Sequence, residues 1–110
     1  MSVPVCIVTG VGPGTGSALV RRFARDYQVA MISRDASRLD ELASTIENAH
    51  AYPGNVADFD ATSHILERIR SELGTPSVLI HNAVRGTFGD VLDIKPSDLE
   101  VNFRINVQAL

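Results

Sequence analysis

Residues 9–16 have the sequence Thr-Gly-Val-Gly-Pro-Gly-Thr-Gly, and this stretch decides how the chain folds. It follows an apolar run, Val3–Val8, and precedes a run of helix-like composition, Ser17–Tyr27. Backbone N–H groups at the start of a helix lack partners, and the helix dipole favours negative charge there. Because glycine has no Cβ, clustered glycines allow a tight turn and a close approach to a ligand. The stretch therefore predicts a strand, a turn and a helix that together bind a phosphate group.

The glycine spacing separates several kinds of phosphate-binding loop. The G-x-G-x-x-G fingerprint does not fit, because Thr15 stands where its last glycine belongs, and a P-loop would need a following Lys-Ser or Lys-Thr pair. The pattern T-G-x-x-x-G-x-G does fit, with Thr9, Gly10, Gly14 and Gly16. This pattern resembles that of the short-chain dehydrogenase/reductase family. A plain turn remains the alternative explanation for the glycines.

Length and composition describe one ordinary globular domain. The chain has 110 residues, 45% of them hydrophobic, and a formal net charge of −3. Its ten basic residues are scattered and outnumbered by thirteen acidic ones, so we expect no nucleic-acid partner. We also expect no membrane span, no signal peptide and, among the three histidines, no metal site. The single Cys6 excludes an intrachain disulfide, and the cytoplasm is the expected compartment.

Apolar runs alternate with amphipathic runs along the chain. The expected strands are Val3–Thr9, Val29–Ser33, His50–Pro53 and Ser77–Asn82. The expected helices are Ser17–Tyr27, one capped by Asp35 that continues to about Ala49, Asp58–Leu73, and one that starts with a Ser97/Glu100 capping box and continues to the end. Continuously apolar strands separated by helices indicate a parallel sheet covered on both faces. We therefore predict an α/β fold, a Rossmann-type doubly wound parallel sheet with strand order 3-2-1-4, in which residues 1–110 form an incomplete dinucleotide-binding domain.

Several polar or glycine-rich segments fall at the carboxyl ends of these strands, where sheets of this kind bind their ligands. Backbone amides around Thr15 are expected to bind a pyrophosphate. The predicted cofactor-binding residues are Gly10, Gly12, Pro13, Gly14, Thr15, Gly16, Ser33, Arg34, Asn55, Val56, Asn82 and Ala83.

The end of the second strand distinguishes NAD from NADP. A carboxylate there would accept hydrogen bonds from the ribose hydroxyls and indicate NAD, but this chain has Ser33 followed by Arg34. A guanidinium binds a 2′-phosphate by charge and by geometry, so the pair favours NADP(H) over NAD, and Arg38 could reinforce it. Two alternatives stay open: Asp35 could face the ribose instead, and Arg34 could be a solvated arginine at a helix start.

The family resemblance assigns roles to residues outside the glycine loop. Asn55-Val56 stands where family members usually have Asp-Val, which implies contact of Asn55 with the adenine amino group and of Val56 with the ring, a plain turn being the alternative. Asn82 and Ala83 match the middle of an Asn-Asn-Ala-Gly segment, in which Asn82 would brace the strand ends; Val84 departs from its glycine. Asn106 matches an asparagine that opens a helix locally and holds a water of the proton relay, which makes it the predicted catalytic residue.

The family's Tyr-x-x-x-Lys pair does not occur in this sequence, in which the only lysine, Lys95, has Val91 four positions before it. We therefore expect the chain to be the cofactor-binding half of a longer short-chain dehydrogenase/reductase that transfers hydride between nicotinamide and a carbonyl or alcohol substrate. The resemblance also implies a homo-oligomer, either a dimer or a tetramer. The alternatives are a non-catalytic dinucleotide-binding or sensor module and, less favoured, an unrelated nucleotide-binding domain.

Overall fold

The apolar runs form a parallel sheet with helices on both faces. The computed structural model describes residues 3–85 and 89–110. Within these ranges the elements are, in chain order, β1 (Val5–Thr9), α1 (Thr15–Phe23), β2 (Gln28–Ser33), α2 (Ala36–Thr45), β3 (Ala49–Pro53), α3 (Phe59–Glu72), β4 (Pro76–His81), α4 (Pro96–Phe103) and η1 (Arg104–Gln108). The last of these, η1, is a π-helix that continues directly from α4.

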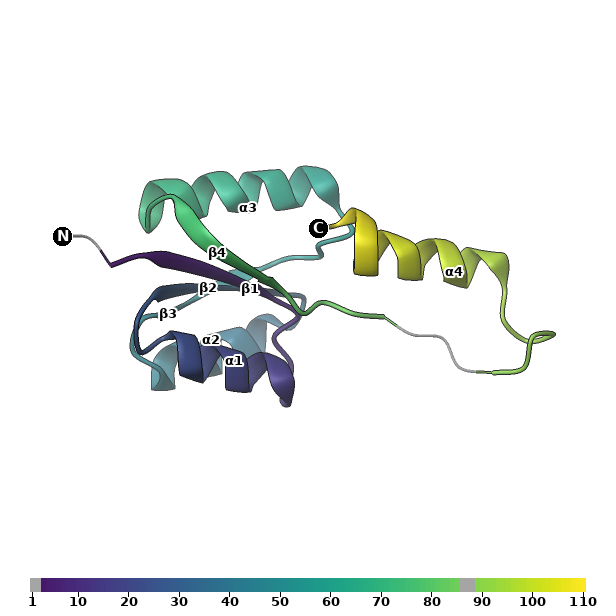
Figure 1. The fold of residues 1–110 in the computed structure, drawn as a ribbon, viewed down its shortest axis with the longest axis horizontal. Helices are drawn as coiled ribbons and strands as arrows, with labels where there is room; N and C mark the ends of the chain where they lie inside the picture. The colour runs from purple at the N-terminus through teal and green to yellow at the C-terminus, as the bar shows by residue number, and fades with distance from the viewer. Residues whose placement is uncertain (1–2, 86–88) are drawn as a thin grey trace.

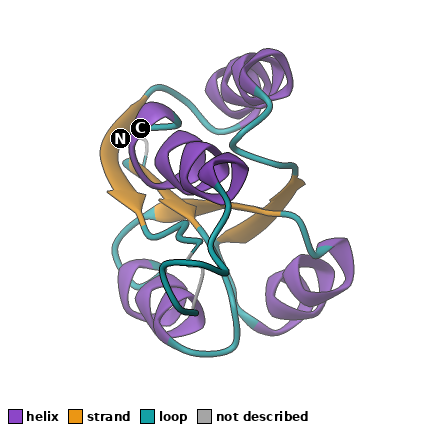
Figure 2. Cartoon of the chain, turned by 90° about the vertical axis from the view of Figure 1, so that its right-hand side faces the viewer, coloured by secondary structure: helices purple, strands orange, loops and turns teal. Residues whose placement is uncertain are grey.

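The strands pair in parallel in the order β3-β2-β1-β4, which confirms the predicted order. Helices α1 and α2 lie on one face of the sheet and α3 on the other, while α4 extends beyond the end of the sheet (Figure 1). Figure 2 shows the same layers from the side, with helices above and below the strands. Because the chain winds outward from β1 in both directions, the loops after β1 and β4 meet where the strand order reverses.

Alternate side chains of the central strands enter two separate cores, because successive residues of a strand point to opposite faces. Val8 and Met31 pack with the core that includes residues of α1 and α2. Ile7 and Ile32 pack with the core that includes residues of α3 and η1. Cys6 is fully buried in the first of these cores, and burial raises the pKa of its thiol.

Several predicted helix boundaries differ from the structure, and α1 ends at Phe23 rather than Tyr27. Helix α1 begins at Thr15 rather than Ser17, because Gly14 of the glycine loop already occupies the N-cap position. Helix α2 ends at Thr45 rather than near Ala49, because Asn48 has a left-handed conformation (φ 69°) that turns the chain into β3. Asparagine tolerates this conformation better than most residues do.

The capping box predicted at Ser97 is wrong. Helix α4 begins at Pro96 with Lys95 at its N-cap, and the Asp98 carboxylate accepts a hydrogen bond from the Lys95 backbone N–H at 3.3 Å. Proline suits the first turn because its fixed φ matches a helix and no N–H partner is needed there. The final helix also changes form after Phe103, where the wider π-helix begins.

Candidate functional site

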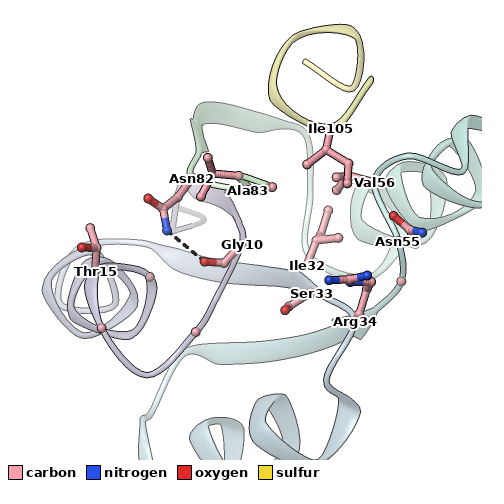
Figure 3. A pocket seen from close by; sticks show the side chains of 15 residues that line it. Gly10, Thr15, Ile32, Ser33, Arg34, Asn55, Val56, Asn82, Ala83 and Ile105 are labelled. Atoms are coloured by element: carbon pink, nitrogen blue, oxygen red, sulfur yellow. Dashed lines mark hydrogen bonds between the residues drawn. The ribbon is translucent and has the colours of Figure 1, made fainter. Parts of the chain in front are cut away.

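A cavity of about 420 Å³ lies at the carboxyl ends of the strands, the edge that the sequence predicts. Its volume is in the range of small-molecule and cofactor sites. Its lining residues are Gly10, Gly12, Gly14, Thr15, Gly16, Ile32, Ser33, Arg34, Gly54, Asn55, Val56, Asn82, Ala83, Val84 and Ile105. Figure 3 shows how these segments surround one space. Every predicted cofactor-binding residue except Pro13, which is exposed, is therefore at this cavity.

The glycines of the loop serve two different purposes. Gly10 has φ 72°, and a Cβ on it would lie 2.5 Å from Cα of Ala83, while a Cβ on Gly16 would lie 2.7 Å from Cα of Val11. Side chains at these two positions would collide with the protein's own backbone. Gly12 and Gly14, in contrast, have no atom within 4 Å of a built Cβ. Their missing side chains keep space open in the cavity.

The start of α1 presents hydrogen-bond donors to this space. Ser17 is anchored to the loop, because both its backbone N–H and its hydroxyl donate to the Gly12 carbonyl. Within the described residues, the N–H groups of Thr15 and Gly16 in the first turn of α1 have no acceptor. Unpaired donors at a helix N-terminus bind anions by hydrogen bonding and through the helix dipole.

Polar groups join the ends of β1 and β4. The Thr9 hydroxyl accepts hydrogen bonds from the N–H groups of Asn82 (3.1 Å) and Ala83 (3.2 Å) and lies 2.8 Å from Nδ1 of His81. The Asn82 carboxamide donates to the Gly10 carbonyl at 2.9 Å (Figure 3). Asn82 therefore braces the two strand ends as expected. Thr9 is buried and its hydroxyl is used within the protein, so it is not at the cavity.

The corner after β2 carries the positive charge of the cavity. Arg34 lines the cavity, and within the described residues no carboxylate lies within ion-pair distance of its guanidinium. Asp35 instead caps α2, accepting a hydrogen bond from the Arg38 N–H at 3.1 Å, and its other oxygen lies 3.9 Å from the Arg38 guanidinium. Asp35 is absent from the cavity lining, so the corner offers a ligand Ser33 and Arg34 rather than a carboxylate.

One wall of the cavity, next to the Arg34 corner, is apolar. Ile32, Val56 and Ile105 contribute to it and are each at most 8% exposed. Asn55 lies beside them in a turn, where its side-chain oxygen accepts a hydrogen bond from the Ala57 N–H at 3.0 Å. The alternative of a turn at this position is thus observed, although Asn55 also lines the cavity. An apolar wall next to polar groups suits a flat, partly polar ring.

Asn106 lies in η1 and outside the cavity lining. Its carboxamide pairs with the backbone of Arg85, accepting from the N–H at 2.8 Å and donating to the carbonyl at 3.0 Å. The helix does open locally here, as the π-helix shows. The side chain itself is used to hold the segment that follows β4.

Residues 4–110 match the protein-family model described as short chain dehydrogenase. The chain belongs to the short-chain dehydrogenase family. Among curated relatives, versicolorin reductase stcU of Emericella nidulans is 29% identical over 110 residues, which cover 94% of this chain and 42% of that protein. L-xylulose reductase of Mesocricetus auratus is 28% identical, covering 94% and 41% of the two chains.

Solved structures of the short-chain dehydrogenase family have the same fold. A metagenomic short-chain oxidoreductase in complex with NADP matches with a TM-score of 0.86 and 26% identity, covering 99% of this chain and 52% of that one. The 3-ketoacyl-(acyl-carrier-protein) reductase of Brucella melitensis, complexed with NADH, matches with a TM-score of 0.88 and 21% identity, covering 98% and 46%. This chain therefore spans about half the length of the family members that it matches.

Sequence reasoning missed part of the cavity lining of this short-chain dehydrogenase chain. Ile32 and Gly54 flank predicted site residues, so the ends of the strands could have indicated them. Val84, which departs from the glycine of the family segment, also lines the cavity. Ile105 comes from a helix remote in sequence, and no local pattern could have placed it at the cavity, because its position depends on how η1 packs against the sheet.

Titratable groups with shifted pKa values lie away from the cavity. Burial and the neighbouring Glu72 carboxylate, which accepts the Tyr52 hydroxyl proton in a 2.7 Å hydrogen bond, raise the pKa of Tyr52 to about 12. Among the described residues, no cluster of His, Cys, Asp or Glu is arranged to hold a metal ion. No helix within residues 3–85 and 89–110 has the length and apolar character needed to cross a membrane.

Proposed function

We propose that this chain is the cofactor-binding half of an NADP(H)-dependent oxidoreductase that acts on a carbonyl or alcohol substrate. The observation that carries the proposal is one cavity with two anion-binding ends. Unpaired N–H groups of Thr15 and Gly16 lie at one end, and the Arg34 guanidinium, without a carboxylate partner in the described residues, lies at the other. The NADP and NADH complexes of the similar structures support a nicotinamide dinucleotide as the ligand.

The residues present fit such a cofactor. The N–H groups of Thr15 and Gly16 would bind its pyrophosphate, and the open space over Gly12 and Gly14 would admit it. Ser33 and Arg34 would bind the 2′-phosphate of the adenosine ribose. The apolar wall, with Asn55 beside it, would receive the adenine. The lining after β4, Asn82, Ala83 and Val84, would then lie toward the nicotinamide end.

The bound nicotinamide would supply or accept the hydride, and the chain's contribution is to bind and orient it. Thr9 and Asn82 hold the ends of β1 and β4 together and so fix this end of the cavity. Asn106 holds the backbone of Arg85, which fixes the segment that continues from the cavity lining. A water of a proton relay at Asn106 stays a prediction of the family resemblance.

The proposal extends to the complete protein in three further respects, namely a small carbonyl or alcohol substrate, a cytoplasmic location and a homo-oligomer. The homo-oligomer is supported by exposed apolar side chains on α4 and η1. Leu99, Phe103 and Val107 follow one another at four-residue steps along α4 and η1 and are each more than half exposed. Apolar side chains grouped on one helix face are typical of an association surface.

Titration of the complete protein with NADPH and with NADH, followed by nicotinamide fluorescence, tests the proposal. Arg34→Ala should weaken NADPH binding about tenfold, because a charge-assisted contact with the 2′-phosphate is lost, and should change NADH binding by less than about twofold. Arg22→Ala is the matched control, since Arg22 of α1 is exposed, pairs with Asp26 after the helix, and lies outside the cavity lining.

Three outcomes bear on the proposal separately. Failure of the wild-type protein to bind either nucleotide at millimolar concentration would contradict it. Equal NADPH affinity of wild type and Arg34→Ala would contradict the NADP preference alone. Binding without turnover over a panel of carbonyl and alcohol substrates would favour the non-catalytic dinucleotide-binding or sensor module.

A further inference from the structure

The turn that carries Ile105 leaves its backbone carbonyl without the donors that usually follow it in a helix. In an α-helix the carbonyl accepts from the N–H four residues later. Here the N–H groups of Ala109 and Leu110 donate to other carbonyls of the same turn, at 2.8 and 3.1 Å. His81, at the end of β4, takes this place, because its Nε2 lies 3.0 Å from the Ile105 carbonyl oxygen.

The hydrogen bonds around Thr9 define which nitrogen of His81 carries the proton. The Thr9 hydroxyl oxygen already accepts from the N–H groups of Asn82 and Ala83, so its one proton is directed to Nδ1 of His81, 2.8 Å away. Nδ1 is therefore an acceptor. The ring proton is on Nε2, and it is donated to the Ile105 carbonyl.

Three consecutive residues of η1 are attached to three different segments. The Arg104 side chain donates to the Ala57 carbonyl at 2.7 Å, and Asn106 pairs with the Arg85 backbone. Between them, Ile105 is attached to β4 through His81 and is the residue of α4 and η1 that lines the cavity. Packing of the described residues at this end is limited, because α4 has no buried residue, Ile105 is the buried residue of η1, and Val101 and Ala109 are only partly buried against the same core.

We propose that His81 is a positioning residue for the nucleotide site. It holds the Ile105 carbonyl by one hydrogen bond, and this bond fixes how far the Ile105 side chain reaches into the cavity beside Val56. His81 is absent from the cavity lining, so it acts through Ile105 and not by touching the ligand. The inference rests on the proposed function, because it needs a nucleotide that contacts the apolar wall.

Two substitutions test the two hydrogen bonds of the His81 side chain separately. In His81→Asn the carboxamide oxygen can replace Nδ1 toward Thr9, but the side chain is too short to reach the Ile105 carbonyl. In His81→Gln the longer side chain can place its NH₂ group near the position of Nε2 and keep that donor. We expect His81→Asn to weaken NADPH binding by the complete protein about three- to tenfold, the range of one net hydrogen bond, and His81→Gln to bind within about twofold of wild type.

A double-mutant cycle with Ile105→Ala tests whether the effect passes through the wall. In the Ile105→Ala background no isoleucine side chain remains to be displaced at the apolar wall. His81→Asn should then change NADPH affinity by less than about twofold. A merely structural role would give the same fold-change in both backgrounds, which would overturn the proposal. Melting temperatures of all variants show which of them fold.

The NADPH affinity of the wild-type protein distinguishes failure of the proposed function from failure of the proposed role of His81. If wild type does not bind, the proposed function fails first. If wild type binds and His81→Asn binds equally well, only the role of His81 is overturned. Should His81→Asn fail to fold, ¹⁵N-histidine spectra of the wild-type protein still decide, because the proposal requires a proton on Nε2 and none on Nδ1 of His81, and the reverse pattern would contradict it.

Discussion

The two ends of the chain bury their apolar side chains very differently. In residues 5–73, the core half, every residue of β1 is buried and the central part of β2 is buried as well. In the described residues of 76–110, the outer half, Leu79 of β4 is 50% exposed and α4 has no buried residue. The apolar content of β4 resembles that of β1, so the difference comes from position: β1 lies between two strands, whereas β4 is at the edge of the described sheet.

This difference shows how the cavity is held together. The glycine loop, the Arg34 corner and Val56 belong to the core half and are supported by packing. The segment after β4 and Ile105 belong to the outer half, where Ile105 and Ala83 pack against the α3-side core and the hydrogen bonds of Thr9, His81, Asn82, Arg104 and Asn106 add to this attachment. A substitution should therefore reduce stability most in the core half, while in the outer half it should act more on ligand binding.

The largest effect is expected from a truncation in the core half. Ile69 of α3 is fully buried, so Ile69→Ala should lower the free energy of unfolding of the complete protein by about 2–5 kcal/mol, through lost burial and the cavity left behind. Leu66→Ala on the same helix is the matched control; Leu66 is 42% exposed, and its loss should cost less than about 1 kcal/mol. Urea denaturation measures both.

Leu79→Ala tests whether β4 of the outer half is as exposed in the complete protein as in residues 76–110. On the half-exposed face of β4 this truncation should cost about 1 kcal/mol or less. A cost as large as that of Ile69→Ala would show that β4 is covered in the complete protein, and the contrast between the halves would then be limited to residues 1–110.

A large effect is also expected at the contact between Gly10 and Ala83, which joins the two halves. Gly10→Ala places a Cβ 2.5 Å from the backbone of Ala83 at a left-handed φ of 72°, so it should destabilise the protein by about 2–4 kcal/mol and weaken NADPH binding. Gly12→Ala is the matched control, because its Cβ would meet no atom within 4 Å. It should leave the melting temperature nearly unchanged and reduce NADPH affinity alone. Equal melting temperatures of the two variants would contradict the role of Gly10.

The contrast between the two halves also explains which features of the fold and of the site could be predicted from the sequence. The strand order and the position of the cavity follow from local patterns, because the glycine loop and the apolar runs of β1 and β2 fold as their composition dictates. The N-cap of α3 at Asp58 is also correct, since its side chain accepts from the N–H of Ala61 in the following turn. These features depend on residues that are neighbours in the sequence.

The features that could not be predicted depend on distant contacts. The end of α2 is set by Asn48, whose side chain bonds with Gln28 and with the Ala24 carbonyl across the core half. The place of Ile105 at the cavity depends on His81, 24 residues earlier in the chain. Neither pairing leaves a periodic or compositional signal, because a single hydrogen bond between remote residues can join many residue types.

A small effect is expected at the Tyr52–Glu72 hydrogen bond, whose two residues are absent from the cavity lining. Tyr52→Phe should lower the free energy of unfolding by about 1 kcal/mol near neutral pH, because one partly buried hydrogen bond is lost while Glu72 keeps its contact with Arg68. The pKa of Tyr52 is raised from 10.0 to about 12 in the folded protein, so the unfolded chain releases this proton first. The stabilisation is therefore complete below pH 10 and declines as the pH rises toward 12. Urea denaturation over this pH range should show the wild-type advantage over Tyr52→Phe shrinking. An advantage that stays constant or grows would contradict the raised pKa. NADPH affinity should not change in this variant, since its hydrogen bond supports α3 within the packed core and not the attachments of the outer half.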